Sequence, residues 1–204
     1  MKIWRPFQRE NYYSAWKDKN ILGVLQEFCS DLRRCYERIW RGYCDYDIFS
    51  IDQWFLGIMP TMLEDFKNNS HGSPLLPNYS SDDMKDKTKA DNMFKNWQAN
   101  LEKMIFLLKE ADEETCSRQN PYQEQYDKAC EEFNEKYGFF GEKLLTEEEK
   151  KSNFSRCYML SDVEEYKPIS DLYFNEYSKL EEYRKKCKDE ALAMFSKWFY
   201  DLWD

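Results

Sequence analysis

Apolar side chains recur every three or four residues over several long stretches of the chain, which is the period of an amphipathic helix. The first such stretch covers residues 21–41: it follows Asn20, a good N-cap residue, and precedes Gly42, a residue suited to a helix C-terminus. We expect one side of this helix to pack in the core. The apolar stripe on that side consists of Ile21, Leu25, Phe28, Leu32, Tyr36 or Cys35, Ile39 and Tyr43.

The second helix is predicted to start at Ser50. Ser50 and Gln53 have the spacing of a capping box, and Phe49 and Trp54 stand at the two positions of a hydrophobic staple. Turn-forming residues then concentrate between residues 68 and 82. The sequence therefore predicts an N-terminal helical pair at 20–67, followed by a loop at 68–82.

The remaining chain, residues 83–204, is predicted to add three more helices. One runs from about residue 83 or 91 to 111, and another lies between Asn120-Pro121 and Gly138. The last begins near Ser170 and continues to the end of the chain, because no proline or glycine interrupts it. Between residues 139 and 167 we expect a short helix with irregular chain. The predicted fold is all-α, a bundle of about five helices with a long C-terminal helix, in one domain spanning residues 1–204.

Composition supports the helical assignment. Aromatic residues make up 18% of the chain, whereas only 6 Gly and 6 Pro occur among 204 residues, so the turn density that sheets need is missing. Apolar runs are too short for a membrane span, and the N-terminus has no apolar signal core. The 7 cysteines are scattered and show no paired spacing. We therefore expect free thiols in a reducing cytoplasm and no contact with a membrane.

Charge is unevenly spread along the chain, with a net value of −9. Residues 1–41 hold nine basic against five acidic residues, and Arg34, Arg38 and Arg41 form a basic ridge along the first predicted helix. An acidic protein is poorly suited to neutralising phosphates, so nucleic-acid binding is disfavoured. A binder of single-stranded nucleic acid that uses this ridge and the aromatic residues stays an alternative function.

The densest cluster of polar residues lies in the segment that connects the first two predicted helices. Asp45, Asp47 and Asp52, together with the lone His71 if its loop folds back, offer oxygen and nitrogen ligands for Mg²⁺ or Mn²⁺, so a metal-dependent enzyme is an alternative function. The favoured interpretation is structural. Asp47 and Asp52 stand where a helix N-terminus attracts anions, and Asp45 can pair with Arg38 or Arg41.

Signals for catalysis are otherwise weak. The chain contains no hydrolase, metalloprotease, P-loop or dinucleotide-binding fingerprint, so we expect no cofactor. Among the cysteines, only Cys44 is expected in an accessible loop, where acidic neighbours would raise the pKa of its thiol. The sequence thus favours a protein that is not an enzyme.

The last ten residues contain five aromatic side chains, more than one side of a helix can bury. Some of them should contact either another chain, which includes the option of a homo-oligomer, or the N-terminal aromatic residues Trp4, Phe7, Tyr12, Tyr13 and Trp16. The residues predicted to contact a partner are Arg34, Arg38, Arg41, Tyr43, Tyr46, Trp198 and Trp203.

The connecting motif also carries a resemblance. The run Gly42-Tyr43-x-Asp45-x-Asp47-x-Phe49-x-Ile51-Asp52 looks like the G-Y-x-D-x-D-x-W-x-L-D motif of an uncharacterised family of bacteriophage and prophage proteins. The resemblance covers about residues 33–77 and the last ten, with Phe49 and Ile51 in place of the usual Trp and Leu. It implies a phage gene expressed in a bacterial host. The predicted function is a non-enzymatic accessory protein that binds a host or phage protein, for example to inhibit a defence or regulatory factor.

Overall fold

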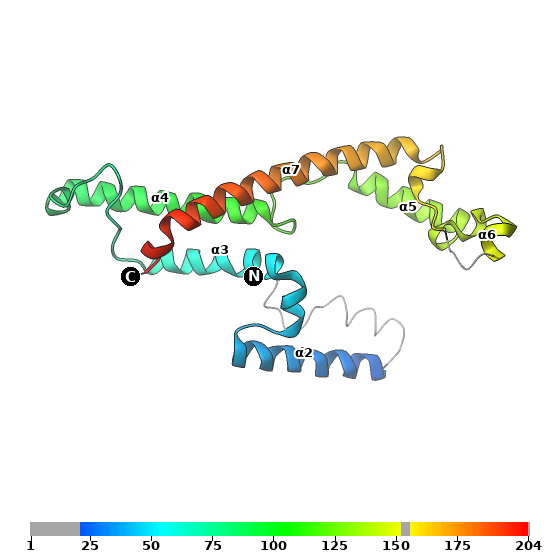
Figure 1. Cartoon of the computed structure of the whole chain (residues 1–204), viewed down its shortest axis with the longest axis horizontal. Coiled ribbons are helices and arrows are strands. Elements are labelled where there is room, and N and C mark those ends of the chain that lie inside the picture. The colour runs from blue at the N-terminus through cyan, green and yellow to red at the C-terminus, as the bar shows by residue number, and fades with distance from the viewer. Residues whose placement is uncertain (1–20, 152–155, 204) are drawn as a thin grey trace. The chain divides into compact units, whose positions relative to one another are not determined.

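A computed structural model describes residues 21–151 and 156–203 of the chain, and every regular element in that part is helical (Figure 1). The predicted all-α fold is therefore confirmed. The chain divides into two compact units: unit 1 comprises the chain up to Thr115 and from Cys187 onward, and unit 2 comprises Cys116–Lys186. The α-helices are α2 (Ile21–Arg41), α3 (Ile51–Asn69), α4 (Lys87–Ala111), α5 (Gln123–Tyr137), α6 (Glu147–Lys151) and α7 (Lys167–Trp198).

Short 3₁₀ helices join or end these elements. They are η1 (Asp45–Ser50), η2 (Asp83–Lys85), η3 (Phe139–Leu144), η4 (Leu160–Asp162) and η5 (Phe199–Asp201). The segment 139–167, for which the sequence predicts a short helix and irregular chain, contains η3, α6 and η4 in its described part. The long C-terminal helix is confirmed, although α7 ends at Trp198 and the chain continues as η5.

Two helix ends lie where the glycines predict them. Gly42 follows α2 with φ of 82° and donates its N–H to the carbonyl of Arg38 at 2.9 Å. Gly138 follows α5 with φ of 80° and donates to the carbonyl of Asn134 at 2.9 Å. Both residues have a positive φ, which a side chain would strain, and this explains why glycine ends these helices.

The start of α3 differs from its prediction. Ser50 does precede the helix, but its side chain makes no capping hydrogen bond, and Phe49 is 87% exposed instead of packing as a staple. The capping-box and staple predictions are therefore wrong. The reason is that η1 runs directly into α3, so Phe49 already lies in a helical turn and not in the extended segment that a staple requires.

The core of unit 1 forms around α4. Helices α3 and α4 lie side by side (Figure 1), linked at their edges by ion pairs of Lys67 with Glu102 and of Lys109 with Glu64. The end of α7 adds aromatic contacts, with the Trp198 ring 5.4 Å from that of Trp97. The apolar stripe of α4 is no more than 6% exposed at any position, and it comprises Met93, Trp97, Leu101, Met104, Ile105 and Leu108.

Unit 2 has a smaller core around α5. Ala129 and Phe133 of that helix pack with Leu160 and Tyr166, and half-buried tyrosines surround them. The ring of Tyr126 stacks on that of Tyr173 at 4.0 Å. None of the helices in the described part of the chain has the length and the apolar composition required to cross a membrane.

Candidate functional site

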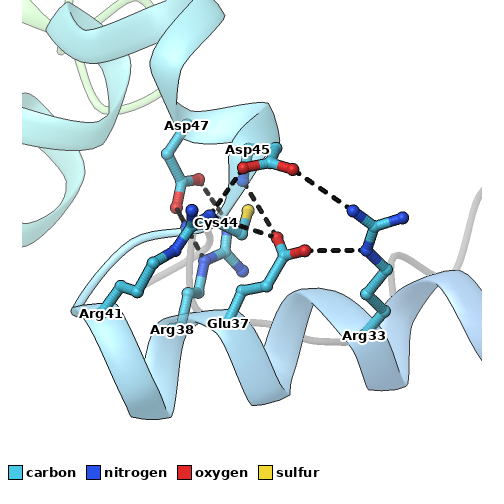
Figure 2. Close-up of polar contacts among 7 residues, drawn as sticks. All are labelled: Arg33, Glu37, Arg38, Arg41, Cys44, Asp45 and Asp47. Atoms are coloured by element: carbon cyan, nitrogen blue, oxygen red, sulfur yellow. Dashed lines mark hydrogen bonds and ion pairs between the residues drawn. The ribbon is translucent and has the colours of Figure 1, made fainter.

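The Asp-rich connection after α2 folds back onto the polar side of that helix (Figure 2). Gly42 reverses the chain, and Cys44 then occupies the N-cap position of η1, where its backbone N–H donates to Oδ2 of Asp47 at 2.8 Å. Cys44 is completely buried, so the prediction of an accessible thiol is wrong. The side chain is held at the start of the 3₁₀ turn, where its sulfur accepts the backbone N–H of Asp47.

At the centre of this connection, Arg38 and Asp47 form a bidentate ion pair. The Arg38 Nε donates to Oδ2 of Asp47 at 3.0 Å, and Nη2 donates to Oδ1 at 2.5 Å. Only 9% of the arginine side chain and 5% of the aspartate side chain are exposed. Burial raises the pKa of Asp47, but the hydrogen bonds from Arg38 and Cys44 outweigh it and hold this pKa below the ordinary value. The carboxylate is therefore charged, and both of its oxygens accept hydrogen bonds.

A more exposed layer of charges surrounds this pair. Arg41 donates to Asp45 at 2.6 Å, and this hydrogen bond lowers the pKa of Asp45. Glu37 accepts from Nε of Arg33 at 2.7 Å and from the backbone N–H of Asp45 at 3.1 Å, and both bonds lower its pKa. The predicted pairing of Asp45 with Arg41 is thus confirmed.

The third arginine of the predicted ridge is paired as well. Arg34 donates to the buried carboxylate of Asp31 at 2.9 Å, and its guanidinium lies 5.4 Å from the ring centre of Tyr46. Arg34, Arg38 and Arg41 each therefore have a carboxylate partner within this helix or in η1. These carboxylates occupy the three guanidinium groups, which reduces the positive charge that they offer to a phosphate backbone.

The four candidate metal ligands do not form a shared site. Asp45 and Asp47 are held by arginines, Asp52 lies exposed in the first turn of α3, and His71 lies exposed in the loop after α3. Within residues 21–151 and 156–203, no three His, Cys, Asp or Glu side chains are placed to hold a metal ion together. The described geometry therefore agrees with the structural interpretation of this Asp-rich motif.

Because the polar side of α2 faces η1, its apolar side faces outward. We define the α2 face as six apolar side chains of this helix that are each between 43% and 79% exposed: Leu25, Phe28, Leu32, Tyr36, Ile39 and Trp40. The prediction that this stripe packs in the core is wrong. The spacing is that of an amphipathic helix, but the ion pairs with η1 decide which side is turned inward.

The other predicted contact residues divide between surface and core. Tyr43, Tyr46 and Trp203 are exposed, whereas Trp198 is buried against Trp97 and contributes to the core of unit 1. The N-terminal aromatic residues proposed as intramolecular partners lie outside the described residues. Sequence reasoning missed Trp40, although its position four residues after Tyr36 places it at the edge of the same stripe.

Comparisons of the chain with protein-family models, with curated proteins and with solved structures give no match. The resemblance to phage proteins therefore stays a prediction about genomic setting. The geometry of α2, with its polar side anchored and its apolar side outward, is the observation from which function is argued.

Proposed function

We propose that this protein acts by binding another protein and not by catalysing a reaction. We further propose that it is a phage-encoded accessory protein in the cytoplasm of a bacterial host, where its partner is a host or phage protein such as a defence or regulatory factor. The observation that supports binding is the α2 face. The motif that resembles phage proteins supports the setting.

The α2 face has the composition of a protein-binding surface. It is a contiguous apolar strip along one helix, and large exposed apolar patches on folded proteins mark sites of interaction. Tyr36 and Trp40 add two aromatic side chains of the kind that dominate the binding energy of interfaces.

The orientation of the α2 face is already set in the free protein. The buried pair of Arg38 with Asp47 holds the opposite side of α2 against η1, and Gly42 sets the turn between them. A preorganised surface loses little conformational entropy on binding, which favours affinity. The polar residues of the motif thus support binding indirectly, by holding α2 in place.

Capture from a bacterial lysate with three immobilised versions of the protein tests this proposal. The wild-type chain and Phe139→Glu, which changes an exposed apolar residue of unit 2, should recover the same partner. Ile39→Glu places a charge on the α2 face and should lose it, because burying an unpaired charge opposes binding. Equal recovery by Ile39→Glu, together with an unchanged course of phage infection in cells that express either version, would contradict the proposal.

A further inference from the structure

The residues of α2 follow the spacing of a coiled-coil seam. Steps of three and four alternate through the positions of Leu25, Phe28, Leu32, Cys35 and Ile39. Such a heptad fits the side chains of a second helix that runs almost parallel or antiparallel to the first. With 21 residues, α2 offers about 31 Å of length for that helix at the usual rise per residue.

The size of the α2 face matches what one half of a stable interface requires. If a whole aromatic side chain presents about 150–250 Å², the exposed parts of the six residues amount to about 700 Å². A standard interface buries about 800 Å² on each partner, whereas the largest apolar patch of a typical monomer is about 300–600 Å². The α2 face is therefore large enough to form most of a dimer interface.

The charges on α2 favour one orientation of two such helices. Its basic residues gather toward the C-terminal end, with Arg38 and Arg41 in the last turn, and Arg33 is the most exposed of them. Because Arg38 and Arg41 are already paired with Asp47 and Asp45, the helix dipoles decide the orientation, and parallel pairing of two copies would bring the two negative helix ends together. Antiparallel pairing separates them and aligns the helix dipoles favourably.

We infer that the α2 face binds the α2 face of a second copy of this chain in an antiparallel, two-fold pairing. When the two-fold axis crosses the seam at the level of residue 30, Phe28 meets Leu32 of the second copy, and Leu25 meets Cys35 of the second copy. Every seam contact then occurs twice, as in an isologous dimer. This inference rests on the proposed function, because it identifies a partner for the same surface.

Complementary charges test the pairing. Leu32→Glu and Phe28→Lys each bury an unpaired charge in the seam, so the dissociation constant of the dimer should rise about 100-fold or more in either variant. Mixed in equal amounts, the two variants should form a mixed dimer, because position 32 of one chain then faces position 28 of the other with opposite charge. Native mass spectrometry identifies the mixed dimer by its mass, and Phe139→Glu is the control that should remain dimeric.

Several outcomes would overturn the inference. The inference is overturned if the wild-type chain stays monomeric over the whole accessible concentration range. This holds whether residues 1–20 or another protein then cover the α2 face. It is also overturned if Leu32→Glu still forms dimers, or if the two charged variants fold but form no mixed dimer. If the wild type is monomeric and Ile39→Glu still loses a captured partner, only the second-copy inference fails. If Ile39→Glu also captures normally, the proposed function fails with it.

Discussion

Helices α2 and α4 carry the same kind of apolar stripe but use it in opposite ways. In α4, the stripe through Trp97 and Leu101 is buried between α3 and the end of α7. In α2, the side turned toward η1 is the polar one, where Asp31 is buried and the Arg38 side chain is enclosed with Asp47 of η1, and the stripe is exposed. The apolar side of a helix is therefore turned inward only where the rest of the chain supplies a surface to cover it.

The difference shows what anchors each helix. Dispersion contacts and the removal of apolar surface from water hold α4, and these contributions grow with every residue of the stripe. A buried, hydrogen-bonded ion pair, surrounded by exposed polar contacts, anchors α2 to η1. Substitutions in α4 should therefore destabilise unit 1 as a whole, whereas substitutions at the anchor of α2 should release that helix locally.

The largest effect is expected from truncation of a core residue of α4. Leu101→Ala removes a side chain with no exposure and leaves a cavity between helices, so the free energy of unfolding should fall by about 3–5 kcal/mol. The matched variant Leu32→Ala makes the same chemical change on the α2 face and should cost less than about 1 kcal/mol when the chain is monomeric. Urea denaturation of both variants measures the contrast, and equal losses would show that the two stripes are packed alike.

The next largest effect is expected at the ion pair of Arg38 with Asp47, which we call the anchor of α2. Asp47→Ala leaves the guanidinium of Arg38 buried without its partner, which costs about 3 kcal/mol in such pairs. The loss should be confined to α2 and η1, so hydrogen exchange of amides in α2 should accelerate while that of α4 stays slow. Asp45→Ala breaks only exposed ion pairs, those with Arg33 and Arg41, and is the control that should leave both helices protected. Acceleration in α4 as well would mean that the anchor is part of the common core.

Acid should weaken the same anchor in wild-type protein, but by less than the substitution does. Because the pKa of Asp47 is lower in the folded protein than in the unfolded chain, its charge stabilises the fold above the ordinary carboxyl pKa of about 3.9. That contribution is lost as the pH falls through the folded-state value. The difference in unfolding free energy between wild type and Asp47→Asn should therefore shrink on acidification, as denaturation at a series of pH values can measure. A difference that does not change with pH would rule out titration of this carboxylate.

The sequence predicts local features of this fold better than contacts between its elements. Gly42 and Gly138 end helices because their conformation is a property of one residue, and Arg41 reaches Asp45 because the two are close in sequence. The pairing of Arg38 with Asp47 depends on the 3₁₀ turn between them, for which the apolar pattern gives no signal. The exposure of the α2 face could not be predicted either, because periodicity identifies an apolar side without specifying what covers it.

The smallest effect is expected from a change at Gly42, in the turn between α2 and η1. Gly42→Ala places a Cβ where no other atom lies within 4 Å, so its only cost is the left-handed backbone at φ of 82°, about 1 kcal/mol. Gly72→Ala is the matched control: its Cβ also meets nothing within 4 Å, its φ is outside the left-handed range, and stability should be unchanged or slightly higher. Because Gly42 lies between α2 and η1, its loss should appear as faster exchange in α2 while α4 stays protected. Equal stability of the two variants would show that α2 is held by its ion pairs without help from the turn.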